Sequence, residues 1–420
     1  MRNLRIRGDK AIWGLVILLS LISIVAVFSS STYRANVSHM EKTALFLEQI
    51  RFVIGGFLFL VLCYIIPLKW YRGLAFVAFG GTTTLLLMTF IPAFQDFRNG
   101  AVRGVKLFGQ SIQVFELAKV GLILYLAKAV EYWEGSLDTF KDFAIKLLLP
   151  IGGTCLLVMA NSFSSALLFG LISFLLLWFM GVRTRFILIS AGGALAGVLL
   201  LFGIYNAFYA GKDSTDEPAG KVEKLFNRFG TVQHRLESYF SGEQEDEETR
   251  LANMTTKEKQ KYLDNKRQSE NAKVAISQGG IIGKGPGKST QRYSLSMAFS
   301  DFIFAFIVEE YGLLGGSFVI LLYMIFLFRC ITIGNRCQTP FSGAVVIGLG
   351  FLIAIQAMLH IYVNIRLLPI TGHTLPLISH GGTAFIILSG AFGIILSVSR
   401  QLDAQEEEAE KTITEDNNNE

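Results

Sequence analysis

Long apolar runs alternate with short polar segments along most of the chain. A bilayer core about 30 Å thick is crossed by roughly 20 apolar residues in a helix, so each run of about that length predicts a transmembrane helix. About ten spans are expected on this criterion, at residues 11–30, 48–67, 74–92, 111–130, 144–161, 163–181, 186–208, 302–329, 342–364 and 382–400. Only a few residues separate the fifth span from the sixth, which predicts a tight helical hairpin or a broken helix pair. The expected fold class is an all-α polytopic membrane protein.

Two longer polar segments interrupt this pattern. The chain divides into residues 1–208 with seven spans, 209–300, 301–400 with three spans, and 401–420. The segment before residue 300 runs from the acidic EQEDEET at 243–249 to the basic, helix-prone KEKQKYLDNKRQ at 257–268, and then becomes glycine-rich. Dense charge of this kind predicts a solvated helix face, although blocks of like charge also allow a partner to dock. The last segment is acidic and rich in asparagine, which predicts a disordered tail.

The composition agrees with a membrane protein. Hydrophobic residues make up 52% of the chain, charged residues 17%, and the mean hydropathy is +0.47, which excludes an ordinary soluble globule. The first apolar run could be mistaken for a signal peptide, but no small-residue cleavage site follows Ser30, so a retained span is predicted. The four cysteines show no C-x-x-C spacing and no clustered histidines, so neither a disulfide nor a zinc site is expected.

The distribution of basic residues predicts the orientation of the chain. The net charge of +5 says little by itself, and nucleic-acid binding is a poor inference, because in a membrane protein the side that each charge occupies matters more. The basic residues of the short loops fall on one side, at residues 2–10, Lys69 and Arg72, 128–146, Arg183 and Arg185, Arg329 and Arg336, and Arg400. Both termini are therefore expected in the cytoplasm, and residues 209–300 outside.

The glycine-rich stretch 279–288 invites comparison with a nucleotide-binding P-loop. That motif, G-x-x-x-x-G-K-[ST], would need a glycine where the chain has Ile282, so no nucleotide is expected. Backbone N–H groups freed by glycine could still hold a pyrophosphate, together with the nearby Lys284, Lys288 and Arg292. The alternative is a flexible loop whose glycines only allow turns.

Asp301 stands between this loop and the apolar run FIFAFIV. Aspartate is a preferred N-cap of a helix, and a carboxylate at the bilayer boundary is also suited to accept a proton. Glu309 and Glu310 should lie roughly 12 to 14 Å further along the same helix, and acids inside a membrane are usually functional. Since adjacent helical residues point about 100° apart, we expect at most one of them to share a cavity wall with Asp301, with Glu309 closer in phase. The other should face a neighbouring helix or form a hydrogen bond within the bundle.

Glu116 and Lys119 lie three residues apart near the outer end of the fourth span, on one helical face. They could form a buried ion pair or complete a charged cavity opposite the eighth span. Arg103, Lys106 and Gln113 would add positive charge and hydrogen bonding to its rim.

The last two spans are joined by residues 364–384, which are rich in Pro, Gly, Ser and Thr. Such backbone is tolerated at membrane depth only where it is buried in protein or lines a water-filled cavity. His373 and His380 have no evident third partner for a metal, so we expect them to shape the cavity.

Taken together, these stretches resemble the SEDS family of bacterial shape, elongation, division and sporulation proteins, over nearly the whole chain up to Arg400. AISQGGIIGKGPGKS followed by SDFIFAFIVEEYG matches the family's A-I-x-x-G-G-x-x-G-x-G and D-F-I-F-A-x-x-x-E-E-x-G. PITGHTLPLISHGGTA matches P-x-T-G-x-x-L-P-x-x-S-x-G-G, and the run NGAVRGVKLFGQSIQVFELAK keeps the family's Arg103, Gln113, Glu116 and Lys119. The motif around residue 380 is more similar to the FtsW-like division members than to the RodA-like elongation members.

The chain departs from the family pattern at two places. Gly104 replaces the usual Trp, and Val114 and Phe115 replace Pro-Ser, so the start of the fourth span should be shaped differently. The hairpin motif P-D-x-G-T is also missing, because the chain has NSFSS at 161–165. A role tied to the absent acid is therefore not expected in this chain.

The resemblance implies a membrane peptidoglycan glycosyltransferase that polymerises lipid II at the outer face of the cytoplasmic membrane. By the same resemblance, Asp301 is the general base. The candidates for binding substrate, by placement and resemblance together, are Arg103, Gln113, Glu116, Lys119, Lys284, Lys288, Arg292 and Glu309. A divalent cation, Mg²⁺ or Mn²⁺, held near Glu116 and Asp301 is a further expectation. The implied partners are a class B penicillin-binding transpeptidase and other division proteins at the septum.

Three other functions remain open at this stage. A lipid II flippase would also carry intramembrane charges and broken helices. The chain could instead be a RodA-like elongation polymerase, or a noncatalytic division scaffold that uses its charged loop and acidic tail.

Overall fold

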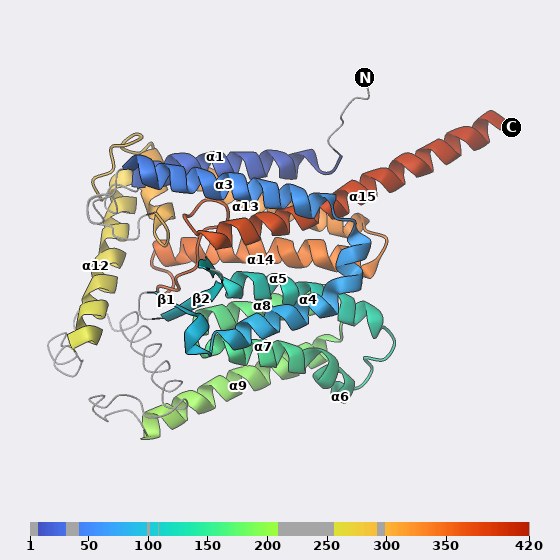
Figure 1. Ribbon diagram of the computed structural model, residues 1–420, viewed down its shortest axis with the longest axis horizontal. Helices are drawn as coiled ribbons and strands as arrows, with labels where there is room; N and C mark the ends of the chain where they lie inside the picture. The colour runs from blue at the N-terminus through green and yellow to red at the C-terminus, as the bar shows by residue number, and fades with distance from the viewer. Residues whose placement is uncertain are drawn as a thin grey trace.

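The structure, a computed structural model, describes residues 7–30, 42–98, 101–107, 109–208, 256–291 and 299–419, and it is built mainly of helices (Figure 1). The long helices lie side by side in one bundle. They are α1 (Lys10–Ser30), α3 (Lys42–Ile65), α4 (Leu68–Met88), α5 (Val114–Tyr132), α7 (Leu149–Met159), α8 (Phe163–Phe179), α9 (Thr184–Phe208), α13 (Ile303–Arg336), α14 (Pro340–Asn364) and α15 (Thr383–Asn419). The short α6 (Phe140–Phe143) and a π-helical turn (Ala144–Leu148) lead into α7.

Each predicted span coincides with a helix, which confirms the all-α fold class. Six segments among the described residues are long and apolar enough to cross a membrane by length and composition, namely Lys10–Ser30, Phe46–Ile65, Phe140–Met159, Ile303–Arg336, Pro340–Asn364 and Thr383–Glu408. The fifth and sixth predicted spans form a tight hairpin, because α8 begins directly after Ser162, whose hydroxyl accepts the N–H of Ser165 at 3.3 Å.

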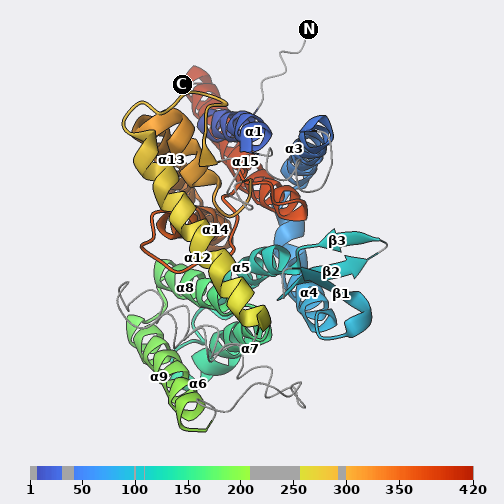
Figure 2. The same cartoon turned by 90° about the vertical axis from the view of Figure 1, so that its left-hand side faces the viewer.

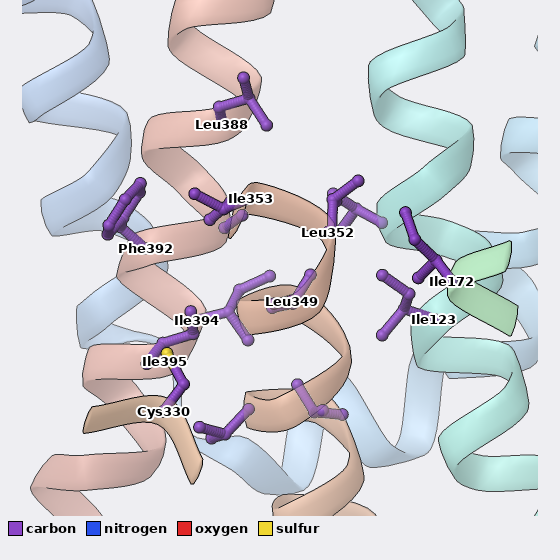
Figure 3. Close-up of a cluster of buried hydrophobic side chains, with 14 of the residues drawn as sticks. Ile123, Ile172, Cys330, Leu349, Leu352, Ile353, Leu388, Phe392, Ile394 and Ile395 are labelled. Atoms are coloured by element: carbon purple, nitrogen blue, oxygen red, sulfur yellow. The ribbon is translucent and has the colours of Figure 1, made fainter. Parts of the chain in front are cut away.

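The core of the bundle lies around α14 and α15. Figure 3 shows Leu349, Leu352 and Ile353 of α14 between α15 on one side and α5 on the other. Close approach is possible because α14 carries glycines: a Cβ at Gly348 would lie 2.7 Å from the side chain of Ile123 in α5. Small residues at helix contacts are the usual means of packing helices in a membrane. The packing of α14 and α15 in the core therefore fixes the positions of the segments at the ends of these two helices.

A small antiparallel sheet follows α4 and was not predicted. It consists of β1 (Gln95–Arg98), β2 (Ala101–Leu107) and β3 (Gln110–Ile112) in that order. Gly104, which replaces the family's Trp, lies in β2, where a Cβ would be 2.1 Å from the carbonyl oxygen of Ile112. No side chain fits there with this backbone, so the close approach of β2 to Ile112 requires glycine at this position.

The basic run before the glycine-rich loop is helical, as predicted, and forms α12 (Thr256–Gly279). This helix crosses one end of the bundle (Figures 1 and 2), which we call the α12 end. It is not only a solvated face, because Ala272 and Ala275 are buried against Phe302 and Phe306 of the α13 region. The acidic run 243–249 lies outside the described residues.

The tail differs from the expected disorder. Helix α15 continues through residues 401–419, and the prediction is wrong over that range. Glu, Ala, Gln and Lys, which fill much of this segment, are good helix formers, so the helix can propagate out of the bundle. Its side chains also bind the rest of the chain: Asp403 accepts the N–H of Gly8 at 2.8 Å, and Glu407 pairs with Arg7 at 2.9 Å. The residues just before α1 thus contact α15 at Asp403 and Glu407, on the side of the bundle opposite the α12 end, and α15 continues outward from there (Figure 1).

Candidate active site

Asp301 lies in the turn directly before α13, at the α12 end of the bundle. The N-cap residue of α13 is Phe302, whose side chain makes no capping bond, so Asp301 is not the N-cap. The first turn of the helix is capped from elsewhere, because the N–H of Ala305 donates to Asn364 Oδ1 at 3.0 Å. The structure therefore does not support capping of α13 as the role of Asp301.

The backbone around Asp301 is held at three successive carbonyl groups. The carbonyl of Phe299 accepts the N–H of His380 at 2.9 Å, that of Ser300 accepts the hydroxyl of Ser379 at 2.8 Å, and that of Asp301 accepts Nδ2 of Asn364 at 3.0 Å. Asn364 is the last residue of α14, and Ser379 and His380 belong to the irregular segment between α14 and α15. The last residue of α14 and the irregular segment after it therefore shape the surroundings of Asp301 through backbone and polar side-chain hydrogen bonds.

Glu116 and Lys119 form a buried ion pair on α5. The Nζ of Lys119 is 2.8 Å from Glu116 Oε1 and donates to Gln356 Oε1 of α14 at 2.7 Å. Only 6% of Glu116 and 2% of Lys119 are exposed. Glu116 Oε2 is also buried and has no hydrogen-bond partner among the described residues. A buried carboxylate oxygen without a donor is an unusual and costly feature, and it leaves one acceptor available to a ligand.

A polar stripe on α14 connects this pair to Asp301. Gln356, His360 and Asn364 are spaced four residues apart on one face of the helix, and each is at most 1% exposed. Gln356 donates to the carbonyl of Thr374 at 3.3 Å, and Nδ1 of His360 is 2.9 Å from the carbonyl of His373. The stripe spans about 12 Å along the helix axis. Sequence reasoning missed these residues, although three polar residues at helical spacing inside an apolar run are a detectable signal.

Gln113 immediately precedes α5, and its backbone and side chain both form hydrogen bonds. The backbone N–H of Gln113 donates to the hydroxyl of Thr383 at 3.0 Å, and its Nε2 donates to the carbonyl of Gly381 at 3.0 Å. Gln113 therefore ties α5 to the start of α15. Arg103 lies in β2, where the structure describes its backbone. Lys106 is exposed, and its Nζ is 3.8 Å from Asp96.

The glycine-rich loop inserts into a break in α13. Gly312 has φ 70°, which interrupts the helix, so Leu313 and Leu314 cannot donate to the carbonyls four residues before them. Their N–H groups donate instead to the carbonyls of Gly280 and Ile281, at 2.9 and 3.2 Å. The loop returns two donors, Lys284 N–H to Glu309 O at 3.0 Å and Gly285 N–H to Glu310 O at 2.9 Å. These loop amides are thus bonded inside the chain.

Glu309 is fully buried and binds this loop, which differs from the expected cavity wall beside Asp301. Its Oε1 is 2.7 Å from Lys284 Nζ and accepts both the N–H and the hydroxyl of Thr290 at 2.9 Å, and Ser289 donates to its Oε2. Lys284 is therefore neutralised by Glu309. Lys288 is exposed, and Arg292 lies outside the described residues.

Glu310 faces a neighbouring helix, as predicted. Its Oε1 accepts the hydroxyl of Ser29 in α1 at 2.6 Å and the N–H of Gly287 in the loop at 2.9 Å. The two adjacent acids together fasten α1, the loop and α13 to one another.

The described residues contain no group of three or more His, Cys, Asp or Glu side chains that could hold a metal ion by themselves. This does not conflict with Mg²⁺, which commonly uses one or two carboxylates and completes its coordination with water and substrate phosphates. The unpaired Oε2 of Glu116 is the atom best suited to that role.

The chain is similar to known proteins over nearly its full length. A family model described as cell cycle protein, covering FtsW, RodA and SpoVE, matches residues 9–404. A probable peptidoglycan glycosyltransferase FtsW from Bacillus subtilis (strain 168) is 30% identical over 408 residues, covering 94% of this chain and 91% of the relative. A protein of the same description from Enterococcus hirae is 28% identical over 411 residues, covering 96% and 95%.

Two solved structures share the fold. A chain from a peptidoglycan synthase complex, studied for its coordination of polymerisation and crosslinking, superimposes with a TM-score of 0.67 at 22% identity, covering 94% of this chain and 98% of that one. The rod shape determining protein RodA of Thermus thermophilus gives a TM-score of 0.62 at 20% identity, covering 95% and 98%. At these identities, the similarity concerns the arrangement of the helices.

Proposed function

This chain belongs to the FtsW/RodA/SpoVE family of cell cycle proteins, and we propose that it is a peptidoglycan glycosyltransferase that polymerises lipid II into glycan strands. Several curated relatives that it matches over nearly their whole length are named probable peptidoglycan glycosyltransferases. The single observation that carries the assignment to a site is the fixed backbone of Asp301. Hydrogen bonds hold the carbonyl groups of Phe299, Ser300 and Asp301. Because the backbone is fixed there, the carboxylate of Asp301 is suited to act as a base with a defined direction.

The proposed reaction uses Asp301 as the general base. Its carboxylate takes the proton from the 4-hydroxyl of the N-acetylglucosamine of an incoming lipid II. The hydroxyl oxygen then bonds to the anomeric carbon of the growing strand, while the bond from that carbon to the lipid pyrophosphate breaks. The pyrophosphate leaves with the bonding electrons. A positioned base of this kind contributes about 10² to 10⁴ in rate.

The departing pyrophosphate requires positive charge nearby. Lys119 is the buried cation closest to the polar stripe, but Glu116 balances its charge. Lys284 is likewise paired with Glu309, so we do not assign it to the pyrophosphate and retain Lys288 as an exposed candidate. A divalent cation, Mg²⁺ or Mn²⁺, would supply the missing charge, with Glu116 Oε2 as its protein ligand.

We further propose a class B penicillin-binding transpeptidase as the partner, with other division proteins at the septum. The fold is shared with a chain of a complex that combines polymerisation and crosslinking, and relatives over the full length are named FtsW. The chain is a multi-pass membrane protein. Its basic loops support the cytoplasmic membrane with both termini inside, and Arg7 and Gly8 contact Glu407 and Asp403 of α15.

Purified protein supplied with its transpeptidase partner and labelled lipid II tests the proposal. Glycan polymer should appear on a gel, and Asp301→Ala should abolish it without loss of folded protein. Asp138→Ala is a matched control, because Asp138 is an exposed acid paired with Arg183. Movement of lipid II across vesicles without polymer would instead identify a flippase, a function that the buried polar stripe also allows. Normal division by Asp301→Ala cells would identify a scaffold.

A further inference from the structure

Asn364 occupies the last position of α14, and none of its surface is exposed. Its carboxamide makes three hydrogen bonds. Nδ2 donates to the carbonyl of Asp301 at 3.0 Å and to the carbonyl of His360 at 2.8 Å, while Oδ1 accepts the N–H of Ala305 at 3.0 Å. Both N–H donors of the amide are used. The side chain is therefore bonded to α14, to the Asp301 turn and to the first turn of α13 at once.

The orientation of this amide is determined by its partners. If the amide were rotated by 180°, its oxygen would face the carbonyls of Asp301 and His360, and its NH₂ would face the N–H of Ala305. All three contacts would then join like groups. The hydrogen bond from Asn364 Nδ2 to the carbonyl of His360, one turn earlier on α14, restricts the Asn364 side chain and directs its other N–H towards the carbonyl of Asp301. Asn364 thus links α14 to the start of α13 through a side chain of fixed orientation.

One of these hydrogen bonds is to Asp301, the proposed general base. We propose that Asn364 is a positioning residue, which fixes the peptide of Asp301 and thereby aims its carboxylate at the acceptor hydroxyl. This inference rests on the proposed glycosyltransferase function. Ser379 supports the same turn from the other side, because its hydroxyl donates to the carbonyl of Ser300 at 2.8 Å and accepts the N–H of Leu375 at 2.8 Å. Reactive groups displaced by about 1 Å can lose about 10²-fold in rate.

The first test is Asn364→Leu, which keeps the size of the side chain and removes its hydrogen bonds. The kcat for lipid II polymerisation should fall about 10²-fold, while the KM and the directly measured affinity for lipid II stay within about twofold. A purely structural role would reduce the folded fraction and the lipid II affinity together, so the separation of kcat from KM distinguishes the two. Unchanged kcat, or a parallel loss of affinity, would overturn the inference.

Thr339→Ala is the matched control on the same helix. Thr339 caps the opposite end of α14, where its hydroxyl accepts the N–H of Ser342. Loss of that cap destabilises α14 without touching the Asp301 turn, so kcat should remain at the wild-type value. If Thr339→Ala lowers kcat as much as Asn364→Leu, the effect belongs to helix stability and the inference fails.

Ser379→Ala decides the question if Asn364→Leu does not fold. It removes one hydrogen bond to the same turn, and kcat should fall about fivefold to tenfold, the equivalent of one hydrogen bond of about 1 kcal/mol. An unchanged kcat would contradict the inference. Two outcomes separate this inference from the proposed glycosyltransferase function. Inactive wild-type protein or an active Asp301→Ala variant would overturn both proposals. An inactive Asp301→Ala variant together with fully active Asn364→Leu and Ser379→Ala variants would overturn only the positioning role of Asn364.

Discussion

Gly283 of the glycine-rich loop lies against Gly312 of α13 so closely that neither can carry a side chain. A Cβ on Gly283 would be 2.5 Å from the nitrogen of Gly312, and a Cβ on Gly312 would be 2.5 Å from the nitrogen of Gly283. Both residues also have positive φ, at 90° and 70°. Gly283 and Gly312 therefore serve the insertion of the loop into the broken helix, a role that differs from holding a free anion.

Replacing either glycine should disrupt this contact. Gly312→Ala is expected to cost about 2 to 5 kcal/mol of unfolding free energy, because a left-handed backbone and an overlap with the opposing chain are penalised together. Thermal unfolding in detergent measures the loss. Gly287→Ala is the control, since Gly287 has φ 72° but nothing within 4 Å of its Cβ position. It should cost only about 1 to 2 kcal/mol, and equal costs at both positions would contradict the close contact.

The pair of Lys284 and Glu309 should behave as a structural unit. Glu309→Leu removes the only carboxylate paired with Lys284 among the described residues and should lower the unfolding free energy by about 2 kcal/mol or more, since the carboxylate is fully buried and the lysine partly exposed. Lys284→Met combined with Glu309→Leu should recover part of that loss. A double-mutant cycle with no coupling energy would show that the two groups do not interact.

Substitutions of Lys119 and Glu116 should affect the unfolding free energy and the polymerisation activity differently. Lys119→Met leaves a buried carboxylate unpaired and should cost about 3 to 5 kcal/mol of unfolding free energy. Adding Glu116→Gln should restore much of the stability, because the uncompensated charge is removed. Polymerisation should stay lost in the double variant if the pair serves the reaction. Recovery of both the unfolding free energy and the polymerisation activity would show that the ion pair has only a structural role.

Chelation tests the proposed cation. Removal of divalent ions with EDTA should stop polymerisation, and added Mg²⁺ or Mn²⁺ should restore it. In Glu116→Gln the metal concentration for half-maximal activity should rise at least tenfold, because the unpaired Oε2 is replaced by a neutral amide. Full activity in EDTA, or an unchanged metal requirement in the variant, would contradict this assignment.

The helical tail should contribute little to the fold. Its ion pairs, Glu407 with Arg7 and Glu406 with Arg336, are roughly half exposed, and such pairs are worth about 0 to 1 kcal/mol each. Deletion of residues 406–420 should therefore leave polymerisation of purified protein unchanged and shift the thermal midpoint only slightly. A large loss of activity in that assay would mean that the tail acts on the site.

The helices were predictable from sequence because length and hydropathy alone decide whether a segment can span a membrane. The hairpin after Ser162 followed from the same criterion. The three-strand sheet was not predictable, since its strands are short and one of them depends on the missing side chain of Gly104. The tail was misjudged because its polarity was read as disorder, although its residues favour helix.

The candidate site was only partly predictable. Asp301 was identified from its motif and its position before an apolar run, and Glu116 with Lys119 from their spacing on one helical face. The partners of Glu309 could not be read from helical phase, because the loop that binds it returns from earlier in the chain. Asn364 was named only as the first residue of a loop, and its hydrogen bond to Asp301 joins residues 63 positions apart.

The stripe on α14 has a consequence for which substitutions this region tolerates. Gln356, His360 and Asn364 each reach a main-chain carbonyl, at Thr374, His373 and Asp301. Every amino acid supplies that carbonyl, so the three hydrogen bonds do not depend on which side chain stands at the accepting position, whereas each donor or ring nitrogen on α14 belongs to one particular side chain. Mutational scanning should therefore find Gln356, His360 and Asn364 restrictive, because these three helix residues supply the side-chain end of each hydrogen bond.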